Sequence, residues 1–239
     1  MGMRLIGPVF MVGGQDFNMV YLDWPANDCN SYLVDTGDQL VMVDCGCGES
    51  ASAILRNIKD MEFNLADLSH VLLTHAHFPH AGGAEALRKN GVEVVAAPAA
   101  VKPLTQGGPA TAAYHYAHRF PRVEGEVTAM EDSEEMELGR CRITALHLPG
   151  HSPGSVGWEV ACEGRRLLFC GDVVRSPALP QQRARLGYDH DAYVQSLLRL
   201  LEDPPHVLYP GHGPFCLSHT DQWIGQELRK LLKSGHAES

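Results

Sequence analysis

Short apolar runs separated by turn residues dominate the first half of the chain, and stretches of helical period lie between them. The apolar runs at residues 31–34 and 40–43 are joined by Asp35-Thr36-Gly37-Asp38, a turn composition that predicts a β-hairpin. A third run, residues 70–74, predicts a buried strand. After Ser50, apolar residues recur at helical spacing, which predicts a helix with Ser50 as its N-cap. Strands and helices are therefore expected to alternate.

The second half of the chain repeats this alternation. Residues 192–201 predict an amphipathic helix whose apolar side is formed by Val194, Leu197, Leu198 and Leu201. Further elements are predicted as helices at residues 84–89 and 223–232 and as strands at residues 92–96, 141–146, 156–160, 166–169 and 207–209. Two similar halves that each end in helices predict an α/β fold in which two sheets pack face to face with helices outside.

The composition is that of an ordinary globular protein. The chain has 239 residues, 44% hydrophobic and 20% charged, and lacks a linker that would divide it, so we expect one domain over residues 1–239. The net charge of −10 without a basic run argues against binding to nucleic acid or to an anionic membrane. The acidic run at residues 131–137 is expected to be a solvated loop. We expect no signal peptide and no transmembrane helix.

The cysteine content bears on the compartment of the protein. Seven cysteines form an odd set without regular spacing, so a complete disulfide framework is not expected and a cytoplasmic location is. A homodimer is the commonest assembly of soluble enzymes. A small molecule is the expected binding partner.

Three histidines lie within six residues directly after the predicted strand at residues 70–74. They belong to the sequence Thr74-His75-Ala76-His77-Phe78-Pro79-His80. Histidines two residues apart on extended backbone share one face. Similar side chains follow later strands in glycine-flanked turns: Pro-Gly-His-Ser, Cys-Gly-Asp and Pro-Gly-His-Gly. Imidazole and carboxylate both bind transition metals at neutral pH, so we predict a metal centre made by His75, His77, His80, His151, Asp172 and His212.

The order and local sequences of these residues resemble the metallo-β-lactamase superfamily over nearly the whole chain, and its glyoxalase II and lactonase-like branch in particular. The resemblance implies a four-layer αββα sandwich of two mixed sheets with helices on both outer faces. It also implies a first metal site made by His75, His77 and His151. A second site would be made by His80, His212 and a bridging Asp172. Zinc is the expected ion, one or two per chain, although iron, manganese and nickel also suit these ligands.

One position departs from the family's His-x-His-x-Asp-His motif, because Pro79 stands where the motif has aspartate. In the family that aspartate completes the second site and orients a hydroxide. Without it, the second site either holds zinc with a water as fourth ligand or stays empty. Asp44 is expected to organise the loop beneath the site by hydrogen bonding. A thiolate could fill the vacancy; the cysteines considered for it, which are otherwise small buried residues, are Cys45, Cys47, Cys170 and Cys216.

The expected chemistry follows from a dication held by imidazole and carboxylate, which lowers the pKa of bound water toward ~7 and polarises a carbonyl. The resemblance implies a metal-dependent hydrolase that uses metal-bound hydroxide on a small thioester or lactone, with His151 and Asp172 as catalytic residues. Two alternatives stay open. One is a mononuclear non-haem iron enzyme similar to the persulfide dioxygenases, with two histidines and an aspartate as ligands. The other is a catalytically weak metal-binding protein, which Pro79 favours.

Two segments are expected to determine the substrate, and neither contains a readable motif. The first is an insertion rich in Ala, Gly and Pro at residues 98–126, which includes His115 and His118. The second is the loop at residues 173–188. Its Arg175, Arg183 and Arg185 either bind a substrate anion or belong to a solvated loop.

Overall fold

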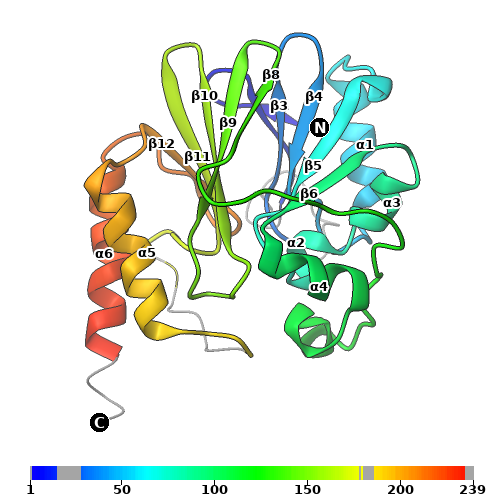
Figure 1. Ribbon diagram of the computed structural model, residues 1–239. Helices are drawn as coiled ribbons and strands as arrows, with labels where there is room; N and C mark the ends of the chain where they lie inside the picture. The colour runs from blue at the N-terminus through cyan, green and yellow to red at the C-terminus, as the bar shows by residue number, and fades with distance from the viewer. Residues whose placement is uncertain (1, 15–27, 178, 180–185, 235–239) are drawn as a thin grey trace.

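Two β-sheets face each other at the centre of the molecule, and helices cover both outer faces (Figure 1). The structure is a computed structural model that describes residues 2–14, 28–177, 179 and 186–234. Arg183 and Arg185 lie outside the described residues. The arrangement confirms the αββα sandwich of two mixed sheets that the resemblance implied.

The first sheet contains the predicted hairpin and the strand that leads to the histidine motif. Its strands, in spatial order, are β1 (Met3–Arg4), β2 (Val9–Gly13), β3 (Ser31–Asp35), β4 (Leu40–Val43), β5 (Leu68–Leu72), β6 (Glu93–Ala96) and β7 (Thr128–Ala129). The pairs from β1 to β4 are antiparallel and those from β4 to β7 are parallel. Parallel neighbours need a crossover, supplied here by α1 (Ala51–Asp60), α3 (Ala84–Arg88) and, between β6 and β7, α4 (Pro98–Gln106). The strands β1 and β2 were not predicted.

The second sheet is formed by the second half of the chain. Its strands, in spatial order, are β12 (Val207–Pro210), β11 (Arg165–Gly171), β10 (Val156–Cys162), β9 (Cys141–His147) and β8 (Glu135–Leu138). The expectation of a solvated loop at residues 131–137 was wrong for its last three residues, which belong to β8. Acidic residues are tolerated there because the strand lies at the sheet edge, where Arg142 of β9 pairs with Glu135 and Glu137.

Three separate hydrophobic cores correspond to the three interfaces between the four layers. One lies between the two sheets, one between the first sheet and α1, α3 and α4 (Pro98–Gln106), and one between the second sheet and α5 (His190–Glu202) and α6 (Thr220–Ser234). Strand β4 shows the principle. Leu40 and Met42 enter the helix-side core whereas Val41 and Val43 enter the core between the sheets, because successive side chains of a strand point to opposite faces.

Helix α5 buries a face that only partly overlaps the one that its aliphatic residues suggested. Its buried residues are Tyr193, Ser196, Leu197 and Leu200, which follow the i, i+3, i+4, i+7 spacing of one helix face. Leu198 remains 41% exposed. Leu197 is buried, and Val194 and Leu201 pack partly buried against the same core, so the prediction was wrong for Leu198 alone. It omitted Tyr193 and Ser196 because it counted aliphatic residues only, whereas the loops around the site supply contacts for these two.

The cysteines and the helices bear on the expected environment of the protein. Cys141 and Cys162 form a disulfide between β9 and β10, and the remaining five cysteines are free and buried. Disulfides are rare in reducing compartments, so this pair weighs against the expected cytoplasmic location, which stays a prediction. Within the described residues, none of the helices combines the length and apolar character needed to cross a membrane.

Candidate metal centre

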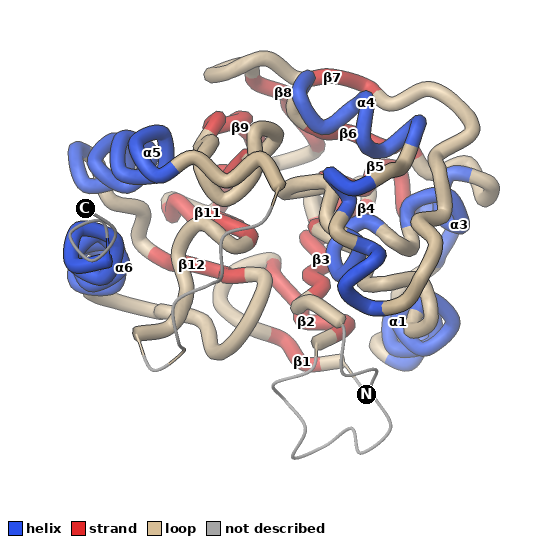
Figure 2. Tube along the Cα trace, turned by 90° about the horizontal axis from the view of Figure 1, so that it is seen from below, coloured by secondary structure: helices blue, strands red, loops and turns tan. Residues whose placement is uncertain are grey.

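All six predicted ligands lie in the connections that follow strands β5, β9, β11 and β12. Figure 2 views the two sheets from the lower side of Figure 1, where helix α2 is labelled. His75 follows β5, and His77 and His80 lie at the start of and within the short helix α2 (Phe78–Ala81). The remaining three come from the second sheet: the β9–β10 turn and the ends of β11 and β12 carry His151, Asp172 and His212. This convergence is the usual one for sites at the carboxyl ends of strands.

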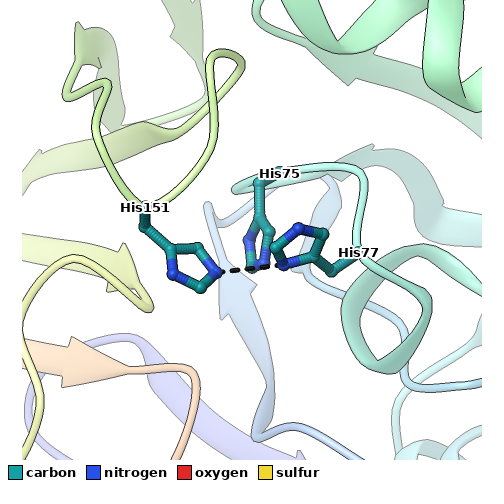
Figure 3. A group of neighbouring side chains, drawn as sticks. All are labelled: His75, His77 and His151. Atoms are coloured by element: carbon teal, nitrogen blue, oxygen red, sulfur yellow. Dashed lines mark hydrogen bonds between the residues drawn. The ribbon is translucent and has the colours of Figure 1, made fainter. Parts of the chain in front are cut away.

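Three histidine side chains from two different sheets point toward one another (Figure 3). At least one ring nitrogen of each of His75, His77 and His151 lies within 4.8 Å of the others, and all three side chains are buried. Nε2 of His151 lies 3.0 Å from Nδ1 of His77. The structure thus brings together the residues of the predicted first site. Their role as metal ligands stays a prediction.

The carboxylate of Asp172 lies among His80, His151 and His212. Its Oδ1 is 3.5 Å from Nε2 of His80 and 3.8 Å from Nε2 of His212, and its Oδ2 is 3.6 Å from Nε2 of His151. Burial opposes the charged carboxylate, but the imidazoles of His212, His80 and His151 hold the pKa of Asp172 well below its ordinary value. Asp172 therefore presents a negative charge to three imidazoles at once, as a bridging ligand would.

A hydrogen-bonded network fixes the orientation of His75 and His80. Asp44 accepts hydrogen bonds from the backbone N–H and the hydroxyl of Thr74, both at 2.8 Å, and its Oδ2 lies 2.7 Å from Nδ1 of His80. Oγ1 of Thr74 lies 3.1 Å from Nδ1 of His75. The expected organising role of Asp44 is confirmed. Because Nδ1 of each ring is engaged, Nε2 of each ring is directed toward the centre.

The residues present fit a metal ion. Nε2 of His75 is buried and makes no hydrogen bond with any residue that the structure describes. Burial, together with the nearby imidazoles of His80, His77 and His151, holds the pKa of His75 well below its ordinary value, so its ring is neutral at pH 7. A buried nitrogen without a partner is costly. A metal ion bound at its lone pair would supply that partner.

A glycine of the Pro-Gly-His-Gly motif has a steric role in the centre. A Cβ at Gly211 would lie 2.3 Å from Cε1 of His80 and 3.1 Å from Oδ1 of Asp172. The first distance is far below van der Waals contact, so any larger residue would displace the imidazole. The backbone of Gly211 also joins the two sheets, because its carbonyl accepts from Asn30 N–H and its N–H donates to the carbonyl of Gly171.

Tyr193 on α5 connects two of the ligand-bearing loops and was not identified from the sequence. Its hydroxyl contacts the backbone carbonyl oxygens of Asp172 at 3.0 Å and Val173 at 2.8 Å. Gly150, with φ of +132°, packs so closely on Tyr193 that a Cβ would lie 2.3 Å from the tyrosine Cα. The residue next to His151 thus rests on the same side chain that holds Asp172.

We expect Tyr193→Phe to weaken metal binding by roughly tenfold, in the range typical of residues that orient metal ligands. The backbone and Cβ of Tyr193, which pack on Gly150, would be unchanged, but the Asp172 loop would lose its hydroxyl contact. Metal affinity measured by competition with a chelating dye checks this. Tyr188→Phe is the control, since the Tyr188 hydroxyl lies 3.3 Å from Nδ1 of His190, which is not a predicted ligand. Equal affinities for both variants would contradict a positioning role.

The substituted motif position lies in the first turn of α2, where proline is readily accommodated. Pro79 is buried, and its carbonyl oxygen accepts a hydrogen bond from the N–H of Cys29 at 3.4 Å. Sγ of Cys45 donates instead to the carbonyl of His80, and Sγ of Cys170 to that of Val174. The cysteine beside the substituted position is thus Cys29, which the sequence analysis missed because, unlike the cysteines considered, it lies far in sequence from Asp44, Asp172 and His212.

The substrate-determining residues predicted from sequence have mixed outcomes. The ring of His118 stacks on Phe78 of the histidine motif with centroids 5.0 Å apart, and its Nε2 is 3.3 Å from a carboxylate oxygen of Glu49. The insertion at residues 98–126 therefore contacts the histidine motif at Phe78. Burial raises the pKa of Glu227 on α6, and the nearby positive charges of Lys230 and Arg175 oppose this shift. This favours a structural role for Arg175.

Comparisons with known proteins agree with the fold. The sequence profile of the metallo-beta-lactamase superfamily matches residues 24–212. The hydroxyacylglutathione hydrolase GloC of Haemophilus influenzae is 29% identical over 83% of this chain and 89% of its own length. A probable metallo-hydrolase of Bacillus subtilis, YqgX, is 31% identical over 77% of this chain and 85% of its own.

Solved structures of the same fold support this family relationship. A subclass B3 metallo-beta-lactamase with an active-site glutamic acid superposes with a TM-score of 0.77 and 26% identity, and the match covers 99% of this chain and 90% of that one. The fold and its histidine-rich edge thus define a metal-dependent hydrolase. The chain belongs to the metallo-beta-lactamase superfamily.

Proposed function

We propose that the protein hydrolyses a small thioester or lactone at a zinc centre made by His75, His77, His80, His151, Asp172 and His212. The observation that carries this proposal is the position of Asp172, whose two carboxylate oxygens lie within 3.5–3.8 Å of Nε2 atoms of three histidines from three different loops. A carboxylate so placed can join two neighbouring ligand groups, which suits either one or two ions.

The metal ion and the side chains of the protein would have different roles in the reaction. When bound, the ion supplies a water of lowered pKa and a Lewis acid for the carbonyl oxygen. The neutral ring of His75 needs no deprotonation before it binds. Thr74 and Asp44 fix the rings of His75 and His80. Pro79 supplies no group that could orient the attacking water, so we expect slower turnover than in relatives with aspartate at this position.

A thioester is supported by the relative from Haemophilus influenzae, which is named a hydroxyacylglutathione hydrolase. A hydroxyacylglutathione contains a thioester carbonyl flanked by a hydroxyl-bearing carbon. Ester-like carbonyls of this kind need a nucleophile and oxyanion stabilisation, both of which one or two dications provide. Lactones require the same two functions.

A mostly apolar cavity of about 430 Å³ lies within the insertion that contacts the histidine motif. Its walls include Pro109, Ala113, Tyr114, His118 and Phe120. One of these residues, His118, also stacks on Phe78, which lies between His77 and His80 in the histidine motif. The size and lining of the cavity suit the apolar part of a small ester.

We expect Tyr114→Ala to raise KM about threefold to tenfold for a substrate with an apolar acyl group, with kcat nearly unchanged. The Tyr114 side chain is 55% exposed at the cavity wall, and loss of an aromatic contact removes about 0.5–1.5 kcal/mol of binding. Leu198→Ala is the control, since it truncates a similarly exposed apolar side chain on α5. A kcat loss at constant KM would argue against a binding role for the cavity.

A substrate panel tests the proposed function directly. Zinc-loaded full-length protein should hydrolyse S-lactoylglutathione, other acyl thioesters or a lactone series, and chelator treatment should abolish the activity reversibly. Absence of turnover on every member by a folded, zinc-loaded protein would reject hydrolysis of this class. That result would favour the alternative interpretation that the protein is a catalytically weak metal-binding protein.

A second candidate function rests on a different ligand group. His75, His80 and Asp172 offer two imidazoles and one carboxylate whose ligand atoms all lie within 4.8 Å of one another. This is the donor set of mononuclear non-haem iron oxygenases. Oxygen uptake by iron-loaded protein with glutathione persulfide would support this function, and its absence would remove it.

A further inference from the structure

Cys29 lies against the residue that breaks the family motif. Its backbone N–H donates to the carbonyl oxygen of Pro79, and its side chain is fully buried just before β3. The motif position that in the family carries a carboxylate ligand is therefore occupied by proline, with a thiol in the adjacent segment. A thiolate is a stronger zinc ligand than a carboxylate.

Three different donor atoms converge at this point. Sγ of Cys29, a carboxylate oxygen of Asp44 and a ring nitrogen of His80 all lie within 4.8 Å of one another. Their side chains are exposed by only 0%, 2% and 1%. Sulfur, oxygen and nitrogen ligands around one zinc ion, with bonds of about 2.0–2.3 Å, lie about 3–4 Å apart. Only small side-chain shifts would therefore be needed to enclose an ion.

The charges of the group also suit a dication. A thiolate and a carboxylate together neutralise a divalent ion, so the occupied site would bury no net charge. Binding of the ion releases the thiol proton of Cys29, because ligand deprotonation is coupled to metal binding. The ion would replace the hydrogen bond between Nδ1 of His80 and Oδ2 of Asp44.

His80 is shared by two ligand groups. Its Nε2 lies 3.5 Å from Oδ1 of Asp172, whereas its Nδ1 lies 2.7 Å from Oδ2 of Asp44. In the family, the motif aspartate favours the Asp172 side by adding a second carboxylate there. Pro79 removes that advantage, while Cys29 adds an anionic ligand on the Asp44 side.

We propose that Cys29, Asp44 and His80 form a buried, thiolate-containing site for one zinc-type transition metal ion, separate from the group of His75, His77 and His151. The ion links the segment before β3, the end of β4 and helix α2. Because its ligands are buried, it acts on the position of the histidine motif and does not contact substrate. This site does not depend on whether the protein hydrolyses thioesters.

Cobalt titration of the metal-free full-length protein tests the site. Thiolate-bound cobalt(II) shows a near-ultraviolet charge-transfer absorption that cobalt bound only by imidazole and carboxylate lacks. We expect this absorption to rise as a second equivalent binds, and to disappear in Cys29→Ser together with one equivalent of bound cobalt. Cys45→Ser is the matched control, since its buried thiol contacts the His80 carbonyl but belongs to no ligand group of the described residues.

Two outcomes of the titration would overturn the proposal. One is wild-type protein with two bound cobalt ions and no thiolate absorption. The other is an absorption that survives Cys29→Ser and disappears in Cys45→Ser. If Cys29→Ser does not fold, zinc-edge X-ray absorption of the unmodified protein decides the question. A sulfur neighbour at ~2.3 Å supports the site, and a shell of nitrogen and oxygen alone rejects it.

Discussion

Replacing His151 with alanine should lower kcat/KM for the best substrate by about 10³-fold or more. The side chain joins His75 and His77 in the buried group and approaches Asp172 to 3.6 Å, so its loss removes a ligand and a contact of the bridging carboxylate. Loss of metal-based activation forfeits several kcal/mol of transition-state stabilisation, and ~4 kcal/mol corresponds to about 10³ in rate. Steady-state kinetics together with metal content measures both consequences.

His147→Ala is the control for that experiment. His147 lies four residues earlier on β9, and its Nε2 is 2.9 Å from the carbonyl oxygen of Met130, away from the ligand group. We expect it to retain metal and most of the activity. If both variants lost activity equally, the effect would be one of hairpin stability. Full activity in His151→Ala would refute the predicted ligand set.

Replacing Pro79 with aspartate should raise kcat at least about tenfold, which corresponds to ~1.4 kcal/mol of additional transition-state stabilisation. The new carboxylate would restore the family's motif and a group able to orient the attacking water. The backbone should tolerate the change, because Pro79 lies in the first turn of α2, where an acidic residue is favoured by the helix dipole. The carbonyl that accepts from Cys29 is retained.

Pro79→Asn separates ligation from the loss of proline. Asparagine has nearly the shape of aspartate but is a much weaker ligand, so it should leave kcat close to that of the natural protein. A rise in both variants would mean that proline restrains the backbone of α2. A fall in Pro79→Asp alone would mean that the natural centre is built for chemistry other than hydrolysis, and would favour the iron oxygenase.

Local patterns accounted for most elements of the fold. Each of the correctly predicted elements has its own period of apolar residues and its own turn residues, so its bounds were predicted within a few residues. These elements are the β3–β4 hairpin, the strands β9 to β12 and the helices α1, α3, α5 and α6. Of the elements that were missed, β2 contains an apolar run of its own at residues 9–12, whereas β8 lacks one. The acidic β8 is a strand only because β9 pairs with it through Arg142, and the buried face of α5 depends on the loops that pack against Tyr193.

Short-range motifs encode which donor groups follow which strand. The sequence alone therefore predicted the histidine motif, the glycine-flanked His151, Asp172 and His212, and the substitution at Pro79. Which donors meet is a property of the tertiary structure. The core between the sheets brings a turn of the second half onto the histidines of the first, so that His151 lies beside His77. The same packing carries Cys29, 50 residues from Pro79, to its carbonyl, and places Tyr193 under two ligand loops. No local sequence pattern predicts these distances, because they depend on how the two sheets pack against each other.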